Sequence, residues 1–466
     1  MDDTIAVIGG GWAGCAAAVE LARRGHRVAL FEAAPVLGGR ARRVMRDGLA
    51  LDNGQHLLLG AYAETLALAD LLRRPSDGPA WSASPLALRP LSRDQGNALS
   101  LTAHSLPAPF GLALGLLTAS GLSVTERLAA LRWFARHRRG GYRVSPSATV
   151  STLLQELPRR VRAHLWDPLC LAALNTPPAR ASAQVFANVL QAAFDTDAAA
   201  ARVVLPRIDL ADALPGPATR WLTARGHAVH TATNARIRGI GPEGIDIDAH
   251  GRRMRMRAAV VAVAPHQLPG AFDRTVADAS PAIATALRDT ARLGYEPITT
   301  VYLGYAAAPG LPRGLVRLDD APGHWIFDRS DILARAATVN DPGRPRVLWA
   351  VVISAGGPHG DLGHPALVRA IDAQLRRSIG SLPAPCWSQV IEEKRATYAC
   401  VPGLPRLRCG HLEGRVYVAG DYTYDAFPAT LEAAVRSGLA AARALADDLN
   451  RGCAAAAAAR DSTRAP

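Results

Sequence analysis

The chain has 466 residues, more than one hydrophobic core usually supports, so two interwoven domains are expected. Apolar residues make up 49% of the chain and aromatic residues 5%, which suits a globular α/β protein. The formal net charge is +13, and nearly all of the basic residues are arginines, because Lys394 is the single lysine. Such a preference for arginine is typical of codon bias, so we do not take it as a sign of a nucleic-acid partner and expect none. A basic surface would also suit anionic lipid.

A glycine-rich turn follows the first apolar run, Ile5–Ile8, which is typical of a buried parallel strand. Gly9, Gly11 and Gly14 fit the pattern G-x-G-x-x-G. In dinucleotide-binding units the first glycine permits the turn, the second lets a pyrophosphate approach the backbone, and the third lets the helix pack closely on the strand. Alone this pattern is a weak signal, because glycine-rich turns also occur in ordinary α/β proteins.

A helix is predicted over about Ala13–Arg24, and its free N–H groups, beginning near Trp12, point at the phosphates. Arg27–Phe31 then forms a second strand. Glu32 ends this strand close to the spacing from Gly14, roughly 20 residues, that is expected of a carboxylate accepting the ribose hydroxyls of an adenosine. Strand, turn, helix, second strand and acidic end agree, so the sequence predicts a dinucleotide site.

The next two segments indicate which dinucleotide is bound. The Gly-Gly-Arg loop Gly38–Arg40 brings backbone and a guanidinium close to an anion, and arginine can bind phosphate with two parallel hydrogen bonds. The segment Asp52–His56 follows. This order of motifs resembles flavoproteins of the amine oxidase and phytoene desaturase superfamily, which hold FAD rather than NAD. The resemblance implies that the two segments lie along the pyrophosphate and flavin, with the contacts Gly39, Arg40, Asn53, Gly54, Gln55 and His56.

Between His104 and Thr125 the chain carries no Arg, Lys, Asp or Glu. Prolines and glycines interrupt its apolar core, Leu106–Leu122, so a complete membrane span is not expected. Two interpretations remain open: a helix buried in the substrate domain, or a surface patch that dips into a bilayer so that a lipid-soluble substrate can enter. A capping box, Ser123–Glu126, then begins a helix that ends at Arg136–Arg139.

The middle of the chain alternates between helical and β-rich segments. Residues 147–194 are mainly helical, and residues 207–226 look like one helix leading back to the cofactor domain. Two apolar runs, 299–305 and 347–354, indicate the antiparallel sheet that floors a substrate cavity. The other predicted elements are strands at 227–231, 234–240, 259–265 and 391–398, a hairpin within 244–263 turning at Gly251, and a helix at 366–379.

The C-terminal part supplies the second half of the cofactor site. An apolar strand, Arg415–Val418, leads to Gly420-Asp421, and a helix with a proline near its start follows from Pro428. On its own Asp421 would be read as an ordinary turn residue. The superfamily resemblance implies instead that it touches the ribityl or phosphate region and that Val229 lies against the adenine. The contacts expected here are Gly420, Asp421, Ala429, Thr430 and Leu431.

These segments predict an α/β fold with a Rossmann-like FAD-binding domain of the three-layer ββα type and an inserted α+β substrate domain. The FAD-binding domain is assigned to residues 1–72, 207–290 and 410–450. The substrate domain is assigned to residues 73–206 and 291–409, and residues 451–466 to a flexible tail.

The exact residues of several segments indicate one family within this superfamily. The chain resembles the hydroxysqualene dehydroxylase family, the squalene-associated FAD-dependent desaturases of hopanoid gene clusters, most specifically in LDNGQHLLLGAY and WDPLCLAALNTPP at residues 51–62 and 166–178. This resemblance implies reduction of hydroxysqualene to squalene, with hydride delivered by reduced flavin to a lipophilic C30 isoprenoid in a long apolar tunnel. The external electron donor is unknown, and NADPH or a redox protein would serve.

Two residues are predicted to be catalytic. His56 follows the segment expected beside the flavin and is the first candidate to protonate the departing hydroxyl, although a hydrogen bond to flavin or backbone would explain it equally well. Asp167 is the second candidate, and Tyr424 and Lys394 are weaker ones.

Rival functions keep the fold but change the chemistry. The chain would then be a carotenoid-type desaturase or amine oxidase that oxidises its substrate, a non-redox flavin-dependent isomerase, or a flavin-stabilised lipid-binding protein without turnover.

The cysteines and the N-terminus indicate the compartment. Six cysteines are scattered without C-x-x-C spacing, as in a protein with reduced thiols and neither a disulfide framework nor a metal site. No secretory signal is seen, because the run Ile5–Ile8 is too short and acidic residues precede it. We therefore expect a cytoplasmic protein that associates peripherally with the inner face of the cell membrane.

Overall fold

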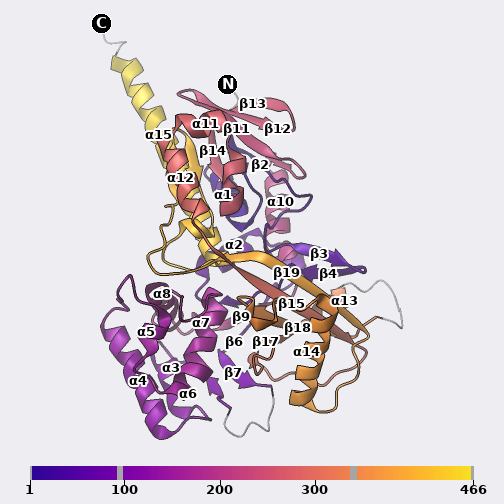
Figure 1. Cartoon of the computed structure of the whole chain (residues 1–466). Coiled ribbons are helices and arrows are strands. Elements are labelled where there is room, and N and C mark those ends of the chain that lie inside the picture. The colour runs from indigo at the N-terminus through magenta and orange to yellow at the C-terminus, as the bar shows by residue number, and fades with distance from the viewer. Residues whose placement is uncertain (1–2, 92–97, 336–343, 463–466) are drawn as a thin grey trace.

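The computed structural model describes residues 3–91, 98–335 and 344–462, and two large sheets dominate it (Figure 1). The first sheet has six strands in the order β10–β2–β1–β14–β21–β20, all parallel except β20 at the edge. Its strands are β1 (Thr4–Ile8), β2 (Arg27–Phe31), β10 (Ala228–His230), β14 (Ala258–Val261), β20 (Gly410–Glu413) and β21 (Val416–Val418).

Side chains alternate between the two faces of this sheet. Ile5 and Val7 of β1 are buried against the helices α1 (Trp12–Arg23), α10 (Pro215–Thr223) and α15 (Leu431–Ser462). Ala6 and Ile8 point the other way, into a core shared with the antiparallel sheet of β11 (Ala235–Gly241), β12 (Gly244–Ala249) and β13 (Arg252–Met256). Because β-strand side chains have a period of two, one apolar strand holds both layers together. The predicted three-layer α/β fold is confirmed.

The second sheet has seven strands in the order β19–β15–β18–β17–β16–β7–β8. Val301 and Leu303 of β15 face the helix α14 (His364–Ile379), whereas Tyr302 faces the central core. The predicted antiparallel pairing of the two apolar runs is confirmed, since Thr299–Tyr305 pairs with Val347–Ile353. The strands are β7 (Ala87–Pro90), β8 (Leu101–Thr102), β15 (Tyr295–Tyr305), β16 (Leu315–Arg317), β17 (Trp325–Asp328), β18 (Val347–Ser354) and β19 (Trp387–Tyr398).

A group of helices lies beside this sheet at the end of the molecule opposite the C-terminus (Figure 1). The predicted capping box begins α4, because Ser123 N donates to Glu126 Oε2 at 2.8 Å and Glu126 N donates to Ser123 Oγ at 3.3 Å. The group comprises α3 (Phe110–Thr118), α4 (Val124–Arg139), α5 (Val150–Leu154), α6 (Arg159–Val161), a π-helical turn (Arg162–Trp166), α7 (Asp167–Leu174) and α8 (Ala183–Phe194).

Smaller elements join the two halves. β5 (Leu58–Leu59) pairs with β9 (Val203–Pro206), which also pairs with β6 (Trp81–Ser84). The strands of the six-stranded sheet all come from the ranges assigned to the FAD-binding domain, yet β5 pairs across the assigned boundary. We keep the domain boundaries as a proposal. The remaining elements are β3 (Arg43–Arg46), β4 (Leu49–Asp52), α2 (Ala63–Leu72), α9 (Leu210–Ala213), α11 (Arg274–Ala279), α12 (Pro281–Ala291) and α13 (Ser330–Arg335).

Two expectations about helices were wrong. Residues 207–226 form two short helices rather than one, because Pro215 begins α10 at a position where proline is tolerated but cannot continue α9. The expected flexible tail is helical as far as Ser462, since α15 runs on through an alanine-rich segment of high helix propensity. Residues 463–466 lie outside the described residues.

The apolar segment Leu106–Leu122 contains α3, whose Leu112 and Leu116 are buried while Phe110 and Leu117 are exposed. One side of the helix is therefore buried in the protein, as the first interpretation expects, and contact of the exposed side with a bilayer stays a prediction. Within the described residues, no helix combines the length and hydropathy needed to cross a bilayer.

Candidate active site

A cavity of about 1100 Å³ lies between the two sheets and is lined by residues from the N-terminal, middle and C-terminal parts of the chain. Sites for one small molecule usually measure about 300–1,000 Å³, so this cavity lies at the upper end of that scale, as a site for a large cofactor does. The lining contains these predicted cofactor residues: Gly9, Gly11, Trp12, Ala13, Glu32, Gly39, Arg40, Asn53, Gly54, Gln55, His56, Gly420, Asp421, Ala429, Thr430 and Leu431.

The glycines of the first turn have different reasons to be glycine. A Cβ on Gly14 would stand 1.8 Å from the carbonyl oxygen of Gly9, so close helix packing requires glycine there. Gly11 has an ordinary φ of −69°, and a Cβ on it would meet only the Cα of Gly39, at 3.9 Å. Neither the backbone conformation nor the neighbouring protein atoms require glycine at position 11. The missing side chain of Gly11 instead leaves space for a ligand at the start of α1. This is the space that a pyrophosphate requires.

Glu32 is fixed at the carboxyl end of β2. Its Oε2 accepts a hydrogen bond from Gly10 N at 2.6 Å, and its Oε1 accepts one from Ala34 N at 2.7 Å. The carboxylate keeps lone pairs that can accept ribose hydroxyls. Val229, the predicted adenine neighbour, lies in β10 opposite Leu30 and is not part of the cavity lining.

An ion pair joins the two ends of the chain at the cavity. Arg40 Nη2 lies 2.7 Å from Asp421 Oδ1, and Arg40 Nη1 donates to the carbonyl oxygen of Ala396 at 2.8 Å. Burial opposes the charged guanidinium, but the neighbouring Asp421 carboxylate outweighs it and raises the pKa of Arg40. The guanidinium therefore stays charged beside the phosphate-binding turn.

The N-termini of two helices meet at this end of the cavity. The first residues of α1 and α15 both line it. The helices cross closely because Gly438 lacks a side chain: a Cβ there would lie 2.2 Å from the carbonyl oxygen of Ala13. Two helix N-termini and a partly buried guanidinium favour a diphosphate, so the residues present fit FAD.

A buried ion pair lies behind the Asp52–His56 segment. Asp52 is fully buried, accepts from Leu210 N at 2.8 Å and pairs with Arg329 at 3.2 Å. Burial raises the pKa of the Asp52 carboxyl to about 6, although Arg329 acts in the opposite direction.

His56 lines the cavity as a neutral imidazole. Burial lowers its pKa to about 4. Its Nδ1 lies 2.9 Å from the carbonyl oxygen of Gly54, which can only accept, so Nδ1 carries the hydrogen and Nε2 is left as an acceptor. Such a ring is suited to receiving a hydrogen bond from a hydroxyl, and it has no excess proton to give at neutral pH.

Asp167 is placed away from His56. It is half-buried in the first turn of α7 and is not part of the cavity lining, whereas Leu169, Ala172 and Ala173 of the same helix are. Burial raises the pKa of its carboxyl against the opposing charges of neighbouring arginines. The structure therefore does not bring the two predicted catalytic residues together.

Sequence reasoning missed Glu393, a lining residue on β19. Its Oε2 accepts from Asn53 Nδ2 at 3.0 Å, and the same nitrogen donates to the carbonyl oxygen of Arg40 at 3.0 Å. One signal was available: a strand residue between the buried Ile391 and Thr397, on the same face, is expected to point inward. Nothing in the sequence pairs it with Asn53.

Asn175 gives the segment WDPLCLAALNTPP, residues 166–178, a structural role. It ends α7 in a left-handed conformation with φ 47°, and its Nδ2 donates to Thr397 Oγ1 at 3.0 Å. Its Oδ1 accepts from Ala355 N at 2.8 Å. One buried amide thus ties the helices to β19 and to the end of β18, and this contact fixes the wall of the cavity.

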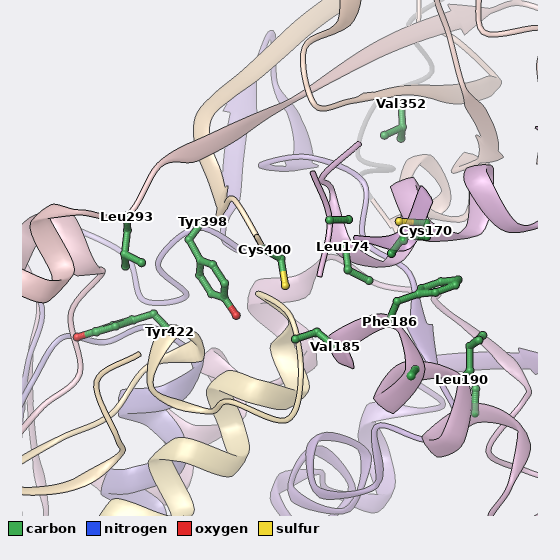
Figure 2. Packing of buried hydrophobic residues seen from close by; sticks show 14 of the residues in the cluster. Cys170, Leu174, Val185, Phe186, Leu190, Leu293, Val352, Tyr398, Cys400 and Tyr422 are labelled. Carbon is green, nitrogen blue, oxygen red and sulfur yellow. The ribbon is translucent and has the colours of Figure 1, made fainter. Parts of the chain in front are cut away.

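The part of the cavity away from the phosphate turn is apolar. Phe186 and Leu190 project from α8 (Figure 2), and Val352 of β18 also belongs to the lining. The apolar lining residues include Leu57, Leu59, Leu86, Leu169, Phe186, Val189, Leu190, Phe194, Ile298, Leu315, Trp325, Phe327 and Val352.

The family model for flavin-containing amine oxidoreductases matches residues 12–446. The chain belongs to this family. It is an FAD-dependent oxidoreductase, and the prediction of FAD is confirmed.

The relatives extend over the whole length of the chain. It is 28% identical over 461 residues to the hydroxysqualene dehydroxylase of Rhodopseudomonas palustris, covering 95% of this chain and 98% of that one. It is 27% identical over 465 residues to the hydroxysqualene dehydroxylase of Sinorhizobium fredii, with the same shares covered. These matches confirm the resemblance drawn from the sequence motifs.

Solved structures agree with the fold. An oxidoreductase from Methanosarcina mazei has a TM-score of 0.73 at 16% identity and covers 94% of this chain and 99% of its own. Cyclohexylamine oxidase from Brevibacterium oxydans has a TM-score of 0.65 at 19% identity and covers 97% of this chain and 100% of its own. At these identities the likeness concerns the fold alone.

Proposed function

We propose that the chain reduces hydroxysqualene to squalene in squalene and hopanoid biosynthesis. The observation that carries the proposal is the two-part cavity, which joins a dinucleotide end built on Gly11, Glu32 and Arg40 to an apolar end lined by α7, α8 and the seven-stranded sheet. A C30 isoprenol has one polar group on a long hydrocarbon, and this division of the cavity suits it. The names of the full-length relatives support the same substrate.

The reaction removes a hydroxyl group and puts hydrogen in its place. The carbon–oxygen bond breaks, the hydroxyl takes one proton and leaves as water, and the carbon receives a hydride. When bound and reduced, FAD supplies that hydride. The protein must hold the carbon in place and exclude water, because water would recapture the carbocation.

Two lining residues suit the hydroxyl end of the substrate. We assign to His56 a positioning role, in which Nε2 accepts a hydrogen bond from the substrate hydroxyl while Nδ1–H stays on Gly54. We assign to Glu393, oriented by Asn53, a negative charge beside the carbon that becomes cationic. These roles replace the proton donation first expected of His56 and Asp167.

The proposal also covers the surroundings of the reaction. The electron donor is external, either NADPH or a redox protein, and the enzyme acts at the cytoplasmic surface of a membrane where its lipid substrate resides. The cofactor contacts named above, and Val229 near the adenine, remain proposals about individual residues.

The test is anaerobic incubation of the reduced holoenzyme with hydroxysqualene, following squalene by mass spectrometry and flavin absorbance together. We expect one squalene for each flavin oxidised. Oxidised holoenzyme with the same substrate is the matched control and should form none. An isomer of hydroxysqualene formed without flavin oxidation would indicate an isomerase. No squalene from the reduced enzyme, together with rapid oxidation of a polyene or an amine by the oxidised enzyme, would indicate a desaturase or an amine oxidase.

A further inference from the structure

The surface around α3 is unusually apolar. Leu106, Phe110, Leu114, Leu117 and Val124 are 40%, 64%, 37%, 42% and 67% exposed, and we call these five residues the α3 face. They are five of the nine large hydrophobic side chains exposed among the described residues, and they fall within one short stretch of chain. Phe110, Leu114 and Leu117 are spaced by four and three residues, so they lie on one side of the helix. A concentrated apolar patch of this kind marks an interaction surface.

The opposite side of α3 fixes the helix to the protein. A Cβ on Gly111 would lie 2.2 Å from the carbonyl oxygen of His104, and one on Gly115 would lie 2.3 Å from that of Thr102. The helix therefore lies directly on backbone, with Leu112 and Leu116 buried beneath it. The α3 face is held outward by close packing, as a docking surface requires.

The stretch of chain that follows the α3 face is strongly positive, and two of its arginines contact the segment directly, Arg127 at Leu117 and Leu122 and Arg160 at Gly121. Residues 104–125 carry no Arg, Lys, Asp or Glu, whereas residues 126–162 carry nine arginines and two glutamates. Arg136 pairs with Glu156, and Arg138 pairs with Asp195. Arg127 donates to the carbonyl oxygens of Leu117 and Leu122, which holds its charged guanidinium at the edge of the patch. The nine are Arg127, Arg132, Arg136, Arg138, Arg139, Arg143, Arg159, Arg160 and Arg162.

An uncharged apolar surface bordered by arginine matches one occupant, an anionic lipid bilayer. Apolar side chains enter the boundary between headgroups and acyl chains, while arginines beside them attract anionic headgroups. A protein partner would be expected to offer acidic side chains, and a second copy of this chain would bring two basic borders together.

The α3 face also lies next to the apolar end of the cavity. Leu112 and Leu116 belong to the same buried cluster as Leu86 and Leu315, which line the cavity. Ala103 N, just before the uncharged segment, donates to the carbonyl oxygen of Leu86 at 2.8 Å. The helix α3 therefore packs on the segment at Thr102 and Ala103, which is hydrogen-bonded to Leu86 of the cavity lining.

We propose that the α3 face docks the enzyme on anionic membranes, with Phe110 and Leu117 entering the bilayer. The docking proposal is argued from the exposed residues and the charge alone. The purpose of docking, which is delivery of a lipid to the cavity, rests on the proposed function.

The test compares two double variants of the holoenzyme in flotation with vesicles of equimolar phosphatidylcholine and phosphatidylglycerol. Phe110→Ser with Leu117→Gln removes the patch, and Met45→Ser with Leu362→Ser, which are 54% and 39% exposed elsewhere, is the matched control. We expect the first to weaken vesicle binding at least about tenfold and the control to leave it unchanged. Vesicles of phosphatidylcholine alone should bind the wild type more weakly, and added salt should weaken binding to the anionic vesicles.

Equal binding of the two double variants, or no binding by the wild type, would overturn the docking proposal. So would a wild-type dimer that the first variant dissociates, since a second copy would then cover the patch. Turnover of hydroxysqualene in detergent micelles should be the same in both variants. Absence of turnover in the wild type and in both double variants would count against the proposed function. The docking proposal would then still be tested by the vesicle binding.

Discussion

The buried ion pair between Asp52 and Arg329 offers a sharp test of how the cavity is held. Asp52 directly precedes the segment Asn53–His56 that lines the cavity, and Arg329 is 3% exposed. In Arg329→Met a side chain of similar length remains, but the carboxylate is left buried without its cation. Removing one partner of such a pair usually costs about 3–5 kcal/mol.

That cost translates into a measurable shift in melting temperature. With about 2.1 cal/mol/K of unfolding entropy for each residue, the 466 residues give about 1 kcal/mol/K if they unfold together. The expected fall in Tm at pH 8 is therefore about 3–5 °C by differential scanning calorimetry of the FAD-loaded protein. Arg329→Met with Asp52→Asn should recover part of the loss, because the neutral amide keeps its acceptor for Leu210 N.

The pH dependence follows from the pKa of Asp52. Burial raises it from 3.8 to about 6 in the folded protein, so folding favours the protonated carboxyl. Asp52 thus contributes stability that is fully present below pH 3.8 and is lost as the pH rises through 6, about 3 kcal/mol at 1.36 kcal/mol for each pH unit. Without Arg329 the pKa rises further, so the deficit of the variant should shrink between pH 8 and pH 5. A deficit that is constant over this range, or a double variant no more stable than the single one, would refute the reasoning.

Three further predictions concern the cavity. Gly11→Val should fold and melt like the unliganded wild type but bind FAD at least about tenfold more weakly, as measured by flavin fluorescence titration, because its side chain enters ligand space and not protein. His56→Gln should raise KM and leave the pH profile of kcat unchanged between pH 5.5 and 8, since a group with pKa about 4 is only about 0.1% protonated at pH 7; disappearance of a limb in that range would contradict the neutral ring. Glu393→Gln should lower kcat on the order of tenfold to a hundredfold with FAD retained, and an unchanged kcat would remove Glu393 from the chemistry.

The local motifs could be predicted because their signals are local. The turn at Gly9–Gly14, the strand that ends at Glu32 and the capping box at Ser123 each depend on spacing within a few residues, and the structure has them where the sequence predicts. The order of these motifs along the chain was enough to indicate the α/β class and the flavin family.

The contacts that complete the cavity could not be predicted, because they join distant residues. Asn53 meets Glu393 across 340 positions, and Asp52 meets Arg329 across 277. No spacing rule connects such pairs. The neutral state of His56 is equally hidden, since it follows from burial and not from its neighbours in sequence.

The carboxylates of the cavity bear on the choice between a lipid and an amine as substrate. An alkylammonium ion would need a free anion to offset the cost of leaving water. Of the carboxylates in the described lining, Asp421 is paired with Arg40 and Glu32 is held by backbone N–H groups at the ribose end. Glu393 accepts from Asn53 Nδ2 and Arg395 N, but it is not part of the ribose end or of the Arg40–Asp421 ion pair. Glu393→Gln therefore separates the two functions: an amine oxidase would lose affinity and show a raised KM for the amine. An enzyme that stabilises a carbocation on an uncharged isoprenoid would instead keep KM and lose kcat, because the charge appears only as the reaction proceeds.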